Sequence, residues 1–290
     1  MAKKKSGASE QTPVHLRHQP GGELPQVEIF GGRDCLEVLD ELAARCRKTG
    51  EYFHTAFADP PFNWNVGYDV CDDKVSPEDY RAFTRNWVLK LCEVVAADGT
   101  VWINCPEDVL LPVGLAAEAA GLKLRRQNVW HYRFGQCINS NFISSHTNAM
   151  YYVRDPKNYS WFPDLILEPS DRAAIYNDPR TQAKKDASMK GLRVPLDVWY
   201  GPGLARVQGN NKERCPGHEN QLPEAYVRRA LLSTTPPRGR VITPFSGSGT
   251  EVAVAVKLGF DAVGIDLSSA YAEAAMDRAK RAYANKECNE

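Results

Sequence analysis

The sequence predicts an α/β fold built on a doubly wound, mostly parallel sheet, with an inserted region between the two halves of the sheet. Short apolar runs alternate with segments of helical periodicity along most of the chain, which is the pattern of parallel strands joined by crossover helices. Residues 155–216 interrupt this pattern and are rich in Pro, Asp, Asn, Lys and Arg, which indicates an insertion outside the core.

Composition limits the classes of function. The chain has 290 residues, of which 43% are hydrophobic, so it can bury a sizeable core. Its 36 basic residues equal its 36 acidic ones, which excludes a uniformly basic coat and means that a polyanion would need a local patch. No apolar run approaches the roughly 20 residues of a membrane span, and the lysine-rich start lacks a secretory signal. We therefore expect a cytoplasmic protein without membrane association.

The eight cysteines are scattered, with no C-x-x-C pair and no close cluster with histidine. Such spacing is typical neither of a zinc site nor of a disulfide framework. We therefore expect no bound metal, and we interpret the cysteines as structural.

The first half of the α/β domain is predicted at 27–154, after a disordered basic tail at 1–26 that has little periodic apolar content. Ser76 and Pro77 are typical of a helix start, and an apolar stripe continues as far as Gly99. The expected strands of this half lie at 27–30, 52–58, 100–104, 129–134 and 150–153, and the expected helices at 36–46, 77–99 and 106–120.

The insertion at 155–216 carries a local charge. Residues 180–214 include eight basic and three acidic side chains, an excess of five positive charges. This excess favours a surface that contacts phosphates, and a solvated loop is the alternative interpretation. The candidate contacts are Lys184, Lys185, Lys190, Arg193, Arg206, Lys212 and Arg214.

The second half is predicted at 217–290, with helices at 222–232, 251–258 and 269–285 and strands at 241–245 and 262–265. A glycine-rich turn, Phe245-Ser-Gly-Ser-Gly-Thr250, joins the first of these strands to a helix, and Asp266 ends the next strand. The glycines let the backbone approach a ligand, and a carboxylate at that strand end can accept hydrogen bonds from ribose hydroxyls. Val252 stands where a dinucleotide fold would have its third glycine, so NAD is disfavoured, and a turn without a ligand is the alternative.

A second motif, Asp59-Pro-Pro-Phe62, follows the strand at 52–58. Because ligands bind outside the carboxyl ends of parallel strands, we expect this motif to face the same crevice as the glycine-rich turn. Its two prolines give a rigid turn that presents two acceptors, the Asp59 carboxylate and the Pro60 carbonyl, which suit one amino group. Phe62 offers a flat face on which a heterocycle can stack. A proline-rich loop with a core Phe is the alternative interpretation.

These two motifs resemble the D-P-P-[YF] and F-x-G-x-G-T motifs of the S-adenosylmethionine-dependent DNA amino-methyltransferases. The order found here, with the catalytic motif first and an insertion between the motifs, is similar to the circularly permuted β class. The stretch Arg33-Asp34-Cys35-Leu36 resembles a segment that helps to hold the cofactor adenine, and His218 and Gln221 resemble the segment that precedes the cofactor strand. This sequence departs from the family pattern at four positions. Thr243 stands where the family usually has an Asp, and Arg33 stands where it usually has a Gly. Glu219 and Leu222 replace the Pro and the Lys of the segment before the cofactor strand.

The resemblance implies a Rossmann-like methyltransferase fold with a catalytic half at 27–154, a target-recognition insertion at 155–216 and a cofactor-binding half at 217–290. It implies that Asp59, Pro60, Pro61 and Phe62 are catalytic. It implies that the residues that bind S-adenosyl-L-methionine are Asp34, Cys35, Asp59, His218, Gln221, Phe245, Ser246, Gly247, Gly249, Thr250 and Asp266.

The activity implied is that of a bacterial or phage-encoded, site-specific DNA methyltransferase of a restriction-modification system, with double-stranded DNA as partner and a homodimer possible. The methyl group would go to the N6 amine of a flipped adenine, because an Asp at the first motif position usually goes with adenine in this family and a Ser with cytosine. The alternatives are a cytosine-N4 enzyme, a non-catalytic DNA-binding module that keeps the fold, and an RNA or protein amine as acceptor. A cytosine-carbon enzyme is disfavoured, because the sequence has no Pro-Cys-Gln nucleophile motif.

Overall fold

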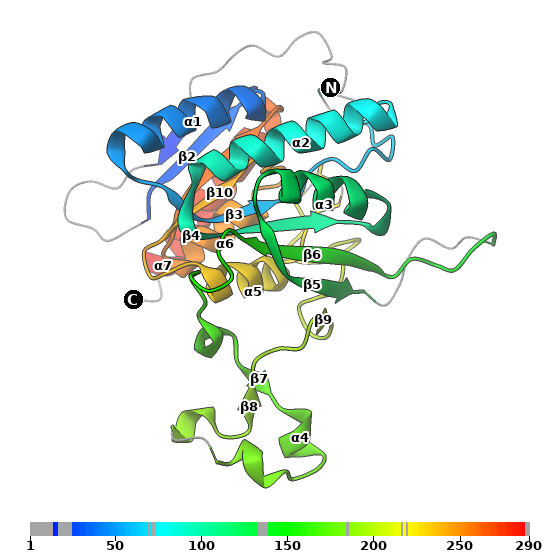
Figure 1. The fold of residues 1–290 in the computed structure, drawn as a ribbon, viewed down its shortest axis with the longest axis vertical. Helices are drawn as coiled ribbons and strands as arrows, with labels where there is room; N and C mark the ends of the chain where they lie inside the picture. The colour runs from blue at the N-terminus through cyan, green and yellow to red at the C-terminus, as the bar shows by residue number, and fades with distance from the viewer. Residues whose placement is uncertain are drawn as a thin grey trace.

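The computed structural model describes residues 14–16, 25–68, 70, 73–132, 139–183, 186–215, 217–218 and 220–287. Its main feature is a nine-stranded sheet in the order β1-β2-β11-β10-β3-β4-β6-β5-β9, parallel except for β1 and β6 (Figure 1). The predicted fold class is therefore confirmed. The strands of this sheet are β1 (Val14–Leu16), β2 (Val27–Gly31), β3 (Phe53–Ala58), β4 (Val95–Cys105), β5 (Lys123–His131), β6 (His146–Val153), β9 (Val198–Trp199), β10 (Arg240–Thr243) and β11 (Asp261–Asp266).

Helices cover both faces of the sheet, as the alternating pattern predicts (Figure 1). On one face, the buried side chains of α1 (Cys35–Thr49), α2 (Pro77–Val94) and α3 (Leu110–Ala119) share a core that includes Leu39 and Trp87. On the other face, α5 (Glu224–Thr234), α6 (Thr250–Leu258) and α7 (Ser269–Glu287) surround Tyr226 and Val252. Burial of these apolar side chains is what holds the layers together.

Helix α2 begins as predicted and ends earlier than predicted. Ser76 caps it by accepting a hydrogen bond from the Asp79 N–H at 3.1 Å, with Pro77 in the first helical position. The expected continuation to Gly99 is wrong, because β4 starts at Val95 and pairs with β3. A side chain at Gly99 would come within 2.9 Å of the His54 carbonyl oxygen, so this close strand pairing requires glycine there.

The insertion contains a small lobe that projects from the body (Figure 1). The lobe pairs β7 (Glu168–Pro169) with β8 (Leu192–Arg193) and carries the short helix α4 (Asp171–Ala174). Three short 3₁₀ helices also lie in the insertion, at η2 (Pro163–Ile166), η3 (Pro179–Thr181) and η4 (Ala187–Met189), whereas η1 (Glu107–Val109) precedes α3.

The prediction that the whole insertion lies outside the core is wrong for its last third. Strand β9 extends the main sheet beside β5, and the Trp199 ring packs 5.9 Å from Trp102 and 5.5 Å from Tyr226. The Trp130 indole donates a hydrogen bond of 2.7 Å to the carbonyl of Leu204, which is also buried. These contacts join segments far apart in sequence, so the local composition of the insertion does not reveal them.

The predicted disordered tail is wrong at Val14–Leu16, which form β1 and pair antiparallel with β2 at the edge of the sheet. Residues 1–13 and 17–24 of that tail lie outside the described residues.

Candidate active site

The two sequence motifs emerge from neighbouring strands. Strands β3 and β10 are parallel and paired, with Thr55 opposite Val241 and Ala56 opposite Ile242. Asp59 directly follows β3, and the turn that starts at Phe245 follows β10 by one residue. Two parallel neighbours end at the same edge of a sheet, so motifs that are far apart in sequence lie side by side.

A cavity of about 280 Å³ lies at this edge and is lined by both motifs. Its walls also include the carboxyl end of β11 and the start of α1. Twelve of the predicted site residues line it, namely Asp34, Cys35, Asp59, Pro60, Pro61, Phe62, His218, Gln221, Phe245, Ser246, Gly247 and Asp266.

Asp59 has a defined hydrogen-bond environment. Its Oδ1 accepts a hydrogen bond of 2.6 Å from the Asn104 side-chain amide, and Asn104 Oδ1 in turn accepts one of 2.9 Å from the Tyr226 hydroxyl. Burial raises the pKa of the Asp59 carboxyl to about 7, and the hydrogen bond from Asn104 partly opposes this rise by stabilising the charged form. Asp59 is thus a carboxylate that can exchange a proton near neutral pH.

The remaining residues of the Asp59 motif are contacted by side chains of α2 and of the loop that follows the motif. Tyr80 of α2 donates a hydrogen bond of 3.0 Å to the Pro61 carbonyl. The Phe62 ring lies 5.2 Å from that of Trp64, which is 50% exposed and does not line the cavity.

The loop after Phe62 is shaped by local hydrogen bonds. Asp73 accepts hydrogen bonds from the backbone N–H groups of Trp64 at 3.0 Å and Val66 at 2.7 Å. Asn63 has a φ of +64° and exchanges two hydrogen bonds with the backbone of Val75. Asparagine tolerates this left-handed conformation better than most residues, and its side chain fixes the return of the loop toward α2.

In the glycine-rich turn, Gly247 and Asp266 are coupled directly. The Gly247 N–H donates to Asp266 Oδ2 at 2.7 Å, and the Ser268 N–H donates to Oδ1 of the same carboxylate at 2.8 Å. Gly247 has a φ of +44°, and a side chain there would come within 2.5 Å of the His218 ring. The turn therefore needs glycine both for its conformation and for the close approach of His218, whose ring also packs 4.9 Å from that of Tyr271.

Gly249 and Thr250, both predicted to bind the cofactor, do not line the cavity. A side chain at Gly249 would come within 2.5 Å of Ala275, so this glycine lets α7 approach the turn. The Thr250 hydroxyl is buried and accepts a hydrogen bond of 2.7 Å from Arg278. These two residues hold the turn against α7 and do not line the cavity.

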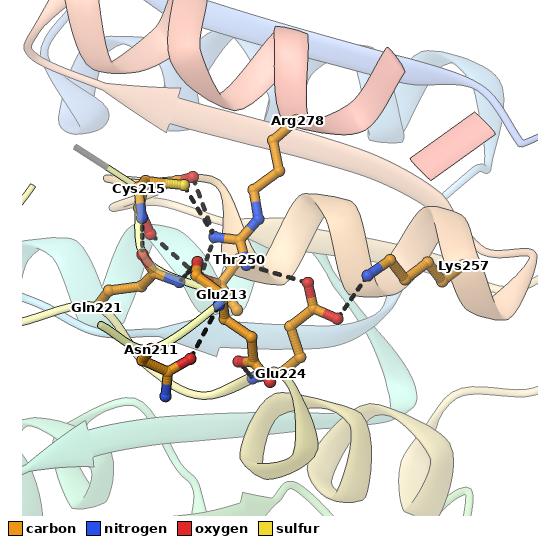
Figure 2. A network of polar contacts seen from close by, with 9 residues as sticks. Asn211, Glu213, Cys215, Gln221, Glu224, Thr250, Lys257 and Arg278 are labelled. Atoms are coloured by element: carbon orange, nitrogen blue, oxygen red, sulfur yellow. Dashed lines mark hydrogen bonds and ion pairs between the residues drawn. The ribbon is translucent and has the colours of Figure 1, made fainter. Parts of the chain in front are cut away.

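Figure 2 shows that Arg278 belongs to a network of polar contacts that includes Thr250, Glu224 and Gln221. Besides Thr250, Arg278 contacts Glu224 Oε1 at 3.1 Å, and Lys257 pairs with the other oxygen of Glu224 at 2.5 Å. The Gln221 amide accepts from the Cys215 N–H at 2.8 Å and donates to the Glu213 carbonyl at 2.7 Å. This network fixes the segment before α5 against α6 and α7, and sequence patterns did not indicate it because its members come from four separate elements.

The walls of the cavity are acidic. Among the described residues that line it there are five carboxylates and neither lysine nor arginine. Because a low-dielectric cavity lined by several carboxylates and no basic side chain favours positive charge, the site suits a cationic ligand. The five carboxylates are those of Asp34, Asp59, Asp73, Glu251 and Asp266.

The predicted DNA contacts differ in their surroundings. Lys190, Lys212 and Arg214 are exposed, whereas Arg206 stacks 5.0 Å from the Tyr132 ring centroid. Arg193 is engaged in the lobe, with ion pairs to Asp171 at 3.0 Å and Glu168 at 3.6 Å. Lys184 and Lys185 lie outside the described residues.

Within the described ranges, no group of three or more His, Cys, Asp or Glu side chains is arranged to hold a metal ion. Of the helices in that part of the chain, none is both long and apolar enough to span a membrane.

A parallel sheet whose strand ends carry a glycine-rich turn, a partnered carboxylate and an acidic cavity defines a nucleoside-binding α/β enzyme. A family model for the N6/N4 methyltransferases, described as DNA methylase, matches residues 53–277. The protein therefore belongs to the N6/N4 DNA methylase family.

Two curated relatives are type II methyltransferases. M.ScaI of Streptomyces caespitosus is 25% identical over 267 residues, which cover 90% of this chain and 83% of the relative. M.HpaI of Haemophilus parainfluenzae is 26% identical over 221 residues, which cover 76% of this chain and 66% of that protein.

Solved structures share the fold. The complex of M1.HpyAVI with SAM has a TM-score of 0.59 at 16% identity and covers 87% of this chain and 98% of that one. The cytosine-N4-specific PvuII DNA methyltransferase has a TM-score of 0.62 at 11% identity, and the match covers 87% of this chain and 86% of that one. The Rossmann-like methyltransferase fold is thus confirmed.

The cofactor of this protein is S-adenosyl-L-methionine, as predicted. The cavity fits it, because the cofactor carries a sulfonium and an ammonium group that suit acidic walls, and its adenine can pack against apolar side chains such as Leu36 and Phe245. Asp266 lines the same cavity and accepts hydrogen bonds from two backbone N–H groups.

Proposed function

We propose that the protein is a site-specific, β-class DNA methyltransferase that transfers the methyl group of S-adenosyl-L-methionine to the exocyclic N6 amine of a flipped adenine. One observation carries the proposal. The Asp59 carboxylate stands in the wall of the cofactor cavity, anchored by Asn104 and flanked by the rigid Pro60-Pro61 turn. An acceptor in this place can receive a hydrogen bond from an amino group brought to the cofactor.

The exocyclic amine of a base is weakly nucleophilic, and inside a duplex it is shielded by pairing and stacking. The base must therefore leave the stack, at a cost of a few kcal/mol that pocket contacts offset. In the proposed complex, Phe62 stacks on the base, and Asp59 with the Pro60 carbonyl accepts the two amine N–H groups. When bound, the cofactor supplies an electrophilic methyl group.

Asp59 then takes up the proton that the nitrogen gives up once it carries the methyl group. Its pKa of about 7 suits this role, because the carboxylate accepts a proton near neutral pH and passes it on to solvent.

The proposed transfer does not require a cysteine nucleophile. Burial next to Asp34 raises the pKa of the Cys35 thiol, and burial raises that of Cys105 to about 12, so both stay protonated.

The choice of adenine is supported by Asp59, because an Asp at this motif position usually goes with adenine in the family. Incubation of DNA with protein and labelled cofactor, followed by mass spectrometry of the nucleosides, tests it. We expect N6-methyladenine. N4-methylcytosine alone would reverse the choice of base, and no label in any sequence context would show a non-catalytic DNA-binding module.

For the target-recognition region we propose the insertion at 155–216, with Lys190, Lys212 and Arg214 as phosphate contacts. All three side chains are exposed. Lys190 belongs to the lobe, which stands away from the body (Figure 1) and can reach the groove of a duplex, whereas Lys212 and Arg214 lie in the later part of the insertion. Arg193 holds the two strands of the lobe together through its acidic partners.

A further inference from the structure

Glu251 lines the cofactor cavity and has no role in the catalytic proposal above. It is the second residue of α6, directly after the glycine-rich turn, and its side chain is only 4% exposed. No sequence motif drew attention to it, because an acidic residue in the first turn of a helix is common on local grounds alone.

The other four carboxylates of the cavity accept hydrogen bonds from neighbouring residues. Asp34 accepts from the Leu36 N–H at 2.8 Å, and Asp59 accepts from Asn104. Asp73 and Asp266 each accept two backbone hydrogen bonds, as described above. These four groups are therefore partly or fully compensated within the protein.

Glu251 differs in this respect. Within the described residues, its carboxylate forms no ion pair and no hydrogen bond to another residue, and only its own backbone N–H and the more distant Arg278 favour its charged form. The basic group that acts on it electrostatically is Arg278, which is already bonded to Glu224 and Thr250 (Figure 2). Burial and the neighbouring Asp59 charge raise the pKa of Glu251 to about 8, so ionisation is costly while the cavity lacks a cation.

We propose that Glu251 binds the ammonium group of the methionine part of S-adenosyl-L-methionine. A buried carboxylate with free lone pairs needs hydrogen-bond donors as well as positive charge. An ammonium group supplies three N–H donors, whereas a sulfonium supplies none. The inference rests on the cofactor and not on the base that is methylated.

The test is equilibrium binding of three ligands to the purified full-length protein in the absence of DNA. S-adenosylmethionine has both cationic groups, S-adenosylhomocysteine keeps only the ammonium, and 5′-methylthioadenosine has neither. Glu251→Gln should weaken the binding of the first two equally, by roughly 10- to 100-fold, and leave the third unchanged. Glu251→Asp, which keeps the charge on a shorter side chain, should lose less.

Glu37→Gln is the control, because it neutralises an exposed carboxylate in the first turn of another helix, α1, outside the cavity. It should change the affinity for all three ligands by less than about threefold. Three results would overturn the assignment of Glu251 to the ammonium, namely unchanged affinities in Glu251→Gln, a loss for S-adenosylmethionine alone, or an equal loss for methylthioadenosine. Wild-type protein that binds none of the ligands would overturn the cofactor assignment itself and this inference with it.

Discussion

The amide nitrogen of Asn104 lies 2.6 Å from the Asp59 carboxylate oxygen, across two adjacent strands of the sheet. Asn104 is 3% exposed and is held in turn by the buried Tyr226 hydroxyl. This pair orients the carboxylate before any ligand arrives, which is the preorganisation that methyl transfer to a poor nucleophile requires.

Replacing Asp59 should separate transfer from cofactor binding. Asp59→Ala is expected to lower the single-turnover transfer rate at least about 100-fold, because the amine loses its acceptor. The affinity for S-adenosylhomocysteine should stay nearly unchanged. Labelled-cofactor transfer and equilibrium binding measure the two quantities, and an equal loss in both would contradict the separate roles.

Asn104 should set the pH dependence of transfer. In the wild type, the rate should fall as the pH drops below about 7 and Asp59 becomes protonated. Asn104→Ala removes a hydrogen bond that favours the charged carboxylate, so it should raise the pKa of Asp59. The acid limb of the pH–rate profile should therefore move to higher pH. Tyr226→Phe should cause a smaller shift in the same direction. An unshifted profile with a lower plateau would indicate a purely structural role for Asn104.

Asp266 should matter for every ligand that contains the nucleoside. Its carboxylate holds the Gly247 turn and lines the cavity, and we propose that it accepts hydrogen bonds from the ribose hydroxyls. Asp266→Ala is therefore expected to weaken the binding of S-adenosylmethionine and methylthioadenosine alike, by about tenfold or more. This contrasts with Glu251→Gln, which should spare methylthioadenosine. Retained affinity for methylthioadenosine in the Asp266 variant would exclude a contact with the ribose.

Without cofactor, Glu251 should destabilise the folded protein at alkaline pH. The folded protein keeps Glu251 protonated up to about pH 8, whereas the unfolded chain releases this proton near the ordinary value of 4.5. The folded state therefore binds more protons in this window, and the contribution of Glu251 to stability falls as the pH rises through it. Glu251→Gln should accordingly raise the free energy of unfolding at pH 8 by about 1 kcal/mol or more. Denaturant unfolding at pH 8 and pH 4.5 measures this, and the gain should vanish at the lower pH.

The exposed and the paired basic residues of the insertion should respond differently. Neutralising Lys190 or Lys212 is expected to lower the salt dependence of DNA binding by about one unit of slope for each phosphate contact that is lost. Arg193→Ala should instead loosen the lobe, because it removes the ion pairs to Asp171 and Glu168. Salt titrations and limited proteolysis distinguish these effects, and an unchanged slope in both lysine variants would remove them from the DNA interface.

The alternation of strands and helices and the two motifs at strand ends can be predicted from the amino-acid sequence alone. These follow from local periodicity, turn chemistry and the rule that parallel strands share a carboxyl edge. For that reason the sequence predicts Asp59, Gly247 and Asp266 in one site, and the structure brings all three to one cavity.

The groups that support or oppose the chemistry at this site become visible only in the folded molecule. Asn104 lies 45 residues from Asp59, Tyr226 lies 122 residues from Asn104, and Trp199 joins the core from within a polar insertion. The unmatched charge of Glu251 also depends on where Arg278 finds its partners. Burial and hydrogen-bond satisfaction are properties of the packed molecule, so they are determined by distant residues that no local pattern contains.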